Sequence, residues 1–115
     1  SGKDRDRLVE RFTRLNYQEE ALRTSISRAY EEVTKPIKGN KKSIHKIDDW
    51  LMQGDREEKV FSYKDLVTSG EMTPKEFQVY ANTRRLYENI FPFKNKEYKK
   101  VIDNNSSKKI NYRHL

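Results

Sequence analysis

The 115-residue chain contains no cysteine, four glycines, three prolines and no apolar run long enough to cross a membrane. The absence of cysteine excludes a disulfide framework and a thiolate metal site. Because the glycines are scattered, there is no glycine-rich loop to hold a nucleotide phosphate. Without a long apolar run or a signal-peptide pattern, we expect no membrane partner. A setting inside a cell or a virion fits these absences, although the sequence leaves the localisation open.

Apolar residues are also scarce, since they make up 33% of the chain against 37% for charged residues. One domain of this composition buries little surface, and such chains are often completed by a partner or by the rest of a larger protein. The start at Ser1 and Gly2, without a methionine, fits an excerpt from a longer protein. The formal charge of +7 and the pI near 9.6 favour acidic partners such as nucleic acid.

An apolar seam runs along the first third of the chain. Its members recur with a period near 3.5 residues, and they are Leu8, Phe12, Leu15, Leu22, Ile26, Ala29 and Val33. The pattern predicts one long amphipathic helix over residues 4–34, which would be about 45 Å long. A compact chain of this length is narrower than that. The helix must therefore kink, protrude or lie along something outside this chain. In the last case, part of the seam (Leu8, Phe12, Leu15, Leu22 and Ile26) would contact another protein or a second copy.

Helix start and stop signals predict a small all-α bundle built on that helix. Pro36 ends the first helix near Thr34, Gly54 ends the second, and Pro92 ends the fourth. The expected helices cover residues 4–34, 43–53, 63–69, 74–91 and 96–103, within one helical domain over residues 1–103. Asparagine, serine and lysine dominate residues 104–115, which predicts a basic flexible tail.

Two of these helices begin with a capping box. Ser62 is followed three residues later by Asp65, and Thr73 is followed in the same way by Glu76. Pro74 occupies the first helical position, where its missing N–H is no loss. No alternating β-strand pattern competes with these signals, so we expect no sheet.

Positive charge is concentrated in two segments. Residues 35–46 carry five lysines and no acid, and residues 94–115 carry seven basic residues and two acids. Such clusters suit contacts with nucleic-acid phosphates, and no motif that reads bases is present. The same composition is typical of a solubilising loop and a mobile terminus, so both interpretations stay open. The residues expected to bind nucleic acid are Lys35, Lys38, Lys41, Lys42, Lys46, Lys99, Lys100, Lys108, Lys109 and Arg113.

The residues that catalysis requires are not suitably spaced. His45 lies in the first basic segment and His114 in the tail, without the spacing of a zinc site or a nucleophile–base pair. Asp48, Asp49 and the acids of residues 55–58 could attract a divalent cation. Adjacent carboxylates on a helix point in different directions, however, so solvated charged surface is the better interpretation. We predict a protein that is not an enzyme and that has no cofactor and no metal.

Aromatic residues recur at near-helical spacing late in the chain. The row consists of Tyr80, Tyr87, Phe91 and Phe93, with Arg84 and Arg85 between them. It could stack nucleic-acid bases. A stripe of this kind is more often core, with the stem of Arg84 laid along it. We likewise expect Trp50 to anchor the second helix against the first.

One ordered set of motifs resembles a known family. Residues 50–55 read WLMQGD, residues 60–66 read VFSYKDL, residues 70–80 read GEMTPKEFQVY and residues 84–87 read RRLY. Their order, over about residues 44–90, resembles a helical segment of the large polyvalent proteins of tailed bacteriophages and mobile elements. Some proteins of that family are packaged in the virion. The resemblance implies a non-enzymatic spacer or binding module of a larger protein, and it carries over no catalytic residue.

Two hypotheses about function follow from the sequence. The first is a non-enzymatic helical module that contacts DNA or RNA without sequence preference through the two basic segments. The second is a protein-interaction or oligomerisation module that uses the apolar seam of the long helix.

Overall fold

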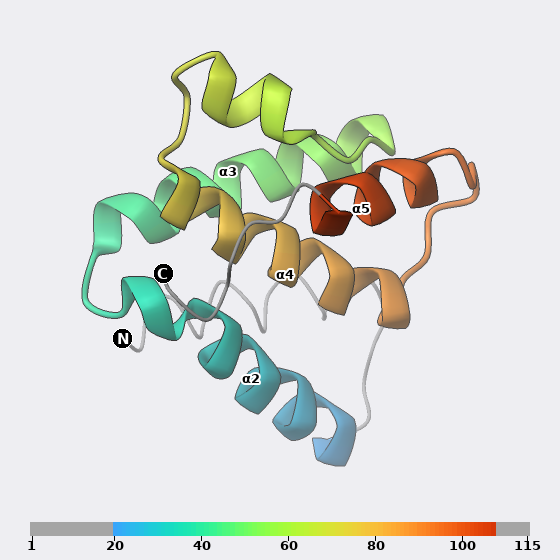
Figure 1. Ribbon diagram of the computed structural model, residues 1–115. Coiled ribbons are helices and arrows are strands. Elements are labelled where there is room, and N and C mark those ends of the chain that lie inside the picture. Colours follow the sequence, from blue (N-terminus) through green and yellow to red (C-terminus); the bar gives the residue numbers. More distant parts are fainter. Residues whose placement is uncertain (1–19, 108–115) are drawn as a thin grey trace.

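The computed structural model describes residues 20–107, with the backbone alone for residues 20–22, 106 and 107 (Figure 1). Every regular element within this range is helical. In chain order they are α2 (Glu20–Thr34), η1 (Lys35–Ile37), α3 (Lys41–Glu57), η2 (Lys64–Thr68), α4 (Pro74–Ile90) and α5 (Tyr98–Ser107). The all-α class is therefore confirmed for the described part of the chain.

Helix α4 is the centre of the fold. The elements α2, α3, α5, η1 and η2 all pack against it, and in Figure 1 it lies between α2 on one side and α3 and α5 on the other. Its inward face carries Phe77 and Tyr80, which together with Leu66 of η2 are 0% exposed. Trp50 of α3, which we expected to face the first helix, makes its ring contact with Phe61, at a centroid distance of 5.0 Å.

The first helix differs from the sequence-based expectation. Its described part, α2, has 15 residues and ends at Thr34, and a single long helix over residues 4–34 is not borne out. Ile26 of the seam is 3% exposed and belongs to the core that α2 shares with α4. Ala29 and Val33, the other described members of the seam with side chains, are half-buried. Leu8, Phe12, Leu15 and the side chain of Leu22 lie outside the described residues.

Helix α3 is longer than predicted, and the prediction that Gly54 ends it is wrong. The helix begins after Asn40, passes through Gly54 and ends at the left-handed residue Glu58, whose φ is 48°. Glycine is required at position 54 because the backbone of the segment that follows the helix lies directly against it. A Cβ atom at Gly54 would lie 2.5 Å from the carbonyl oxygen of Lys59. The Gly54 carbonyl in turn accepts a hydrogen bond of 2.9 Å from the Lys59 N–H.

Both predicted capping boxes form. The Asp65 N–H donates to the Ser62 hydroxyl oxygen at 3.1 Å, and the Ser62 N–H donates to the Asp65 carboxylate at 2.9 Å. This box opens η2, a single π-helical turn where a helix over residues 63–69 was expected. Gly70 follows with a φ of 90°, which a glycine adopts without strain. The second box opens α4 and belongs to the candidate site described below.

The end of the described chain is helical where a flexible tail was predicted. The expected helix covered residues 96–103, whereas α5 runs from Tyr98 to Ser107. The helix extends beyond residue 103 because Asn105 is held in the interior. Asn105 is 3% exposed, and its side-chain amide donates a hydrogen bond of 3.2 Å to the Phe61 carbonyl. A residue that composition assigns to a tail thus anchors α5 to the segment after α3. The remainder of the expected tail, residues 108–115, lies outside the described residues.

The late aromatic row is core at Tyr80 and Tyr87, as predicted, whereas Phe91 and Phe93 are half-buried. Tyr80 is 0% exposed and Tyr87 is 3% exposed. Arg84, also 3% exposed, has its guanidinium carbon 5.4 Å from the centre of the Tyr87 ring and 4.6 Å from that of Phe93. The hydroxyl oxygen of Tyr80 accepts a hydrogen bond of 2.9 Å from the Phe61 N–H, and burial raises the pKa of Tyr80 well above its usual value. These groups are committed to the interior and are not free to stack bases.

Candidate nucleic-acid interface

The first basic segment forms a sharp turn between α2 and α3, which we call the basic corner (residues 35–46; Figure 1). Ile37, 6% exposed, holds η1 against the core. Gly39 has a φ of 83°, which permits the reversal of the chain. Asn40 then caps α3, because its side-chain oxygen accepts a hydrogen bond of 3.1 Å from the Ser43 N–H. Four lysines stand exposed around these anchors: Lys35, Lys38, Lys41 and Lys42.

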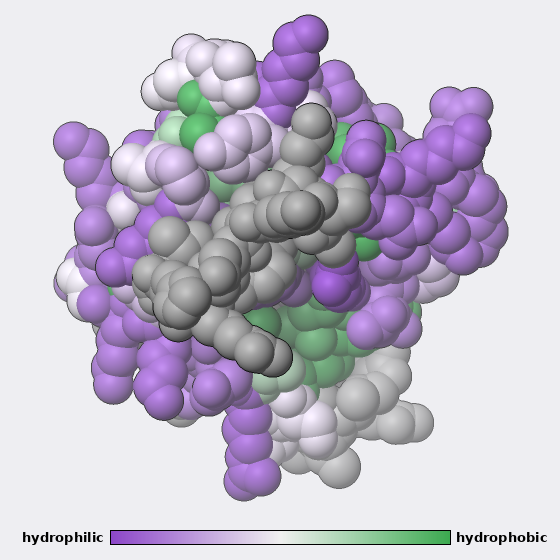
Figure 2. Space-filling view, viewed as in Figure 1, coloured by the Kyte–Doolittle hydropathy of each residue, from purple (hydrophilic) through white to green (hydrophobic). Residues whose placement is uncertain are grey.

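The surface over the basic corner is hydrophilic. The space-filling view shows this at the left of the molecule, where Figure 1 places the turn from η1 into α3 (Figure 2). The segment contains no aspartate or glutamate, and the nearest acids in sequence are Glu32 before it and Asp48 after it. His45 is exposed on α3, one turn beyond Lys41. Local positive charge is therefore high on this side of the molecule.

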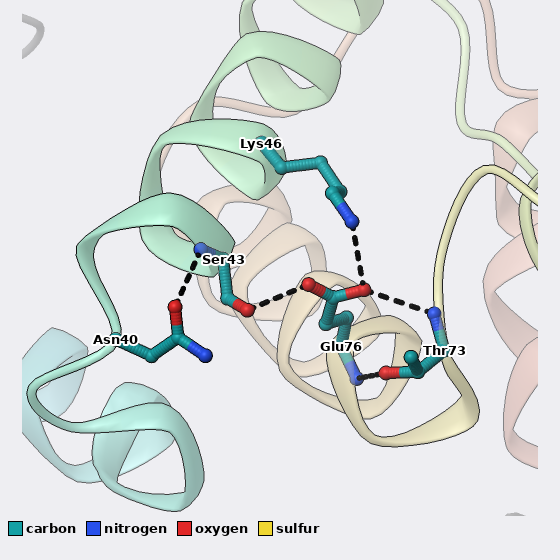
Figure 3. A network of polar contacts seen from close by, with 5 residues as sticks. All are labelled: Asn40, Ser43, Lys46, Thr73 and Glu76. Atoms are coloured by element: carbon teal, nitrogen blue, oxygen red, sulfur yellow. Dashed lines mark hydrogen bonds and ion pairs between the residues drawn. The ribbon is translucent and has the colours of Figure 1, made fainter.

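The first turns of α3 and α4 meet through one carboxylate, that of Glu76 (Figure 3). It accepts a hydrogen bond of 2.6 Å from the Ser43 hydroxyl and one of 2.9 Å from the Thr73 N–H. The Lys46 ammonium lies 3.2 Å from the same carboxylate. The Glu76 N–H donates to the Thr73 hydroxyl oxygen at 3.1 Å, which completes the capping box. Glu76 is 6% exposed, so the carboxylate at the centre of this joint between the two helices is buried, whereas the side chain of Lys46 is 37% exposed.

The joint favours the ionised form of Glu76. Burial raises the pKa of this carboxyl, but the hydrogen bonds from Ser43, Thr73 and Lys46 lower it by more. The net pKa lies below the usual value of 4.5. Glu76 is therefore a carboxylate at neutral pH, and it holds one of the lysines of the basic corner in an ion pair.

The joint also changes which lysines are available to a ligand. Lys46, a predicted nucleic-acid contact, is the lysine paired with Glu76. Lys75 was not predicted, and it is exposed in the first turn of α4, immediately before Glu76. The first turn of α4, which carries Lys75, lies against the first turn of α3, which carries Lys41 and Lys42. The capping box predicted the start of α4, but no sequence signal indicated which helix end that start would meet.

The second basic segment does not join the basic corner within the described chain. Lys99 and Lys100 are exposed on α5. Helix α5 is anchored beside Phe61, after the C-terminal end of α3, whereas the basic corner includes the N-terminal end of α3. The 17 residues of α3 span about 25 Å, so the structure keeps the two groups apart. Lys108, Lys109 and Arg113 lie outside the described residues.

Two of the acids predicted as solvated surface contribute to the packing of the helices instead. Asp48 is 6% exposed. Asp55 accepts a hydrogen bond of 2.7 Å from the Arg84 guanidinium, which joins α3 to α4. The solvated-surface prediction is therefore wrong for both of these residues. No group of three or more histidines, aspartates or glutamates that could hold a metal ion occurs in residues 20–107.

No helix in the described range is long and apolar enough to cross a membrane. Comparisons of the chain with protein-family models, with curated proteins and with solved structures find no match. A function therefore has to be inferred from the basic corner and the joint at Glu76.

Proposed function

We propose that the chain is a non-enzymatic helical module that binds DNA or RNA without sequence preference, through backbone phosphates. The basic corner supports this most directly, because residues 35–46 hold five lysines and no acid, and four of those lysines are exposed. Like charges held this close repel one another, and an anionic partner relieves that repulsion. Lysine acts as a mobile point charge, which suits phosphate contact without base reading.

The remaining basic residues extend this proposal. Lys99 and Lys100 supply a second contact region on α5, and the chain then continues toward Lys108, Lys109 and Arg113. Two separate basic regions suit a long, regular polyanion better than a small ligand, because each region can contact its own phosphates.

The salt dependence of binding tests this function. Fluorescently labelled nucleic acid of mixed sequence is titrated with the full chain at several salt concentrations. We expect binding at low salt, with a logarithm of the association constant that falls linearly with the logarithm of the salt concentration. Exchange of one mixed sequence for another should leave the affinity unchanged. Absence of binding at low salt, or binding without a salt slope, would contradict the proposal.

The resemblance over residues 44–90 supports a placement of this module in a larger bacteriophage or mobile-element protein. Capping boxes and the helix order of the described chain fit a spacer or binding unit of such a protein. The sequence that flanks residues 1 and 115 in the native gene product tests this placement. A reading frame that begins and ends at these residues would contradict it.

A second candidate function is protein interaction through the apolar seam. It is favoured by the way the seam divides: Ile26 is buried against α4, whereas the seam continues through Leu8, Phe12 and Leu15. Apolar residues at this spacing would suit a helical partner or a second copy. Sedimentation of the full chain and of an L8Q/F12Q/L15Q variant tests self-association. The same monomeric mass for both proteins would argue against it.

A further inference from the structure

The basic corner is poor in the side chains that single-stranded nucleic acid uses for stacking. Residues 35–46 contain no phenylalanine, tyrosine or tryptophan, and His45 is their one ring that could stack. Phe77, which follows Glu76 in the first turn of α4, is 0% exposed. Stacking on aromatic rings contributes about 1–3 kcal/mol per base to single-strand binding. A ligand at this corner consequently gains its affinity from phosphates, and the duplex carries them at the higher density, about one charge per 1.7 Å of helix axis.

The available lysines come from three elements. Lys35 belongs to η1, Lys41 and Lys42 to the first turn of α3, and Lys75 to the first turn of α4, with Lys38 in the turn between η1 and α3. The 2.6 Å hydrogen bond between Ser43 and Glu76 fixes the two helix turns against each other. The lysines of α3 and α4 therefore keep a constant spacing, although each side chain remains mobile.

We propose that the ligand of the basic corner is the backbone of a nucleic-acid duplex, contacted by Lys35, Lys38, Lys41, Lys42 and Lys75, while Glu76 withholds Lys46. This inference rests on the proposed function, since it names the class of nucleic acid and the lysines that contact it. Glu76 matters twice, because it joins the two helices and neutralises the lysine nearest the joint. Five phosphate contacts correspond to a salt slope of about −4.5 from this corner on duplex DNA.

The first arm of the test compares the two forms of DNA. The full chain is titrated with a duplex and with a single strand of the same length, at the same series of salt concentrations. We expect tighter binding to the duplex at low salt and a steeper slope, since each contact contributes about 0.9 on duplex DNA and about 0.7 on a single strand. Equal or tighter binding to the single strand overturns the inference.

The second arm compares individual lysines by substitution. K75Q should flatten the duplex slope by about 0.9. K46Q/E76Q removes the ion pair as a unit and should leave the slope unchanged. E76Q alone releases Lys46 and should steepen the slope by about 0.9. At position 76 the glutamine oxygen can accept from the Thr73 N–H while its NH2 group donates to the Ser43 hydroxyl oxygen, so the joint is kept. Circular dichroism verifies the fold of each variant.

The outcomes separate this inference from the proposed function. If the wild-type chain shows no salt-dependent binding to the duplex or to the single strand, the proposed function fails. The inference about the duplex and its lysines fails alone in either of two cases, both with salt-dependent duplex binding by the wild-type chain. In the first case K75Q leaves the salt slope unchanged. In the second case K46Q/E76Q flattens the slope by the amount expected for K75Q.

Discussion

The Ser43 hydroxyl donates a hydrogen bond of 2.6 Å to the carboxylate of Glu76, and this contact joins the first turn of α3 to the first turn of α4. Both residues occupy the third position of their helices, where a backbone N–H needs a cap. The side chains of Asn40 and Thr73 supply those caps. The carboxylate is thereby left to bridge the two helices, and it places the lysines on either side of the bridge.

Acidification should weaken the joint at Glu76. The folded-state pKa of this carboxyl is lowered below its usual value of 4.5, so its stabilisation is fully present above that value and is lost as the pH falls through the folded-state pKa. E76Q cannot titrate. We expect wild-type protein to exceed E76Q in its free energy of unfolding at neutral pH, and the difference to shrink below pH 4.5.

Urea unfolding of the two proteins across that pH range checks this expectation. Titration of the other carboxyl groups affects both proteins and cancels in the difference. A difference that stays constant from neutral pH to well below 4.5 would mean that the joint contributes no pH-dependent stability.

G54A should destabilise the protein, although alanine is the better helix former. In an ordinary helix interior the change from glycine to alanine stabilises by about 0.5–1 kcal/mol. Here the new methyl group would lie 2.5 Å from the Lys59 carbonyl oxygen, and the required backbone shift should cost about 1–3 kcal/mol. R56A, an exposed change in the same helix, is the control and should lie within about 0.5 kcal/mol of wild type. Stabilisation by G54A in thermal unfolding would contradict the close approach of the two segments.

D55A should cost about 2 kcal/mol because it removes the carboxylate that pairs with the buried Arg84. The Arg84 side chain is 3% exposed, whereas that of Asp55 is 34% exposed, so solvent screens the pair only on one side. D55A/R84M replaces the arginine with an apolar side chain and should recover much of the loss. Chemical denaturation of wild type, D55A and D55A/R84M measures both effects. If D55A is as stable as wild type, the ion pair contributes nothing to the contact between α3 and α4.

N105A should loosen α5 at a cost of about 1 kcal/mol, since the mutation removes the hydrogen bond to the Phe61 carbonyl. D103A is the matched control, because Asp103 is exposed on the same helix. Hydrogen exchange of the α5 amides should accelerate in N105A and remain unchanged in D103A. Equal exchange in both variants would argue against an anchor at Asn105.

Sequence signals correctly predicted those helix ends that depend on contacts between residues close together in the chain. Pro36 restricts the residue before it, and α2 ends at Thr34. Thr73 and Glu76 satisfy each other's backbone groups, and α4 begins after Thr73. Such contacts lie within four residues of sequence, so composition and spacing are sufficient to find them.

The wrong predictions concern residues whose role depends on a partner more than four residues away. Gly54 resembles a helix stop until Lys59 returns to it, and Asn105 resembles a tail residue until it meets Phe61. Likewise, the pairing of Lys46 with Glu76, 30 residues away, cannot be found from charge counts. The sequence shows the basic corner as a run of lysines. Which lysines are available at that corner depends on how α3 packs against α4.

The most direct test of nucleic-acid binding by the basic corner is the salt slope of a variant that lacks its exposed lysines. K35Q/K38Q/K41Q/K42Q is compared with wild type as full chains on one duplex, so that basic residues elsewhere contribute equally to both. We expect the slope to flatten by about 3.6, which is 0.9 for each of the four lysines. An unchanged slope in a variant that is still folded would show that the lysines of the basic corner only solubilise the protein.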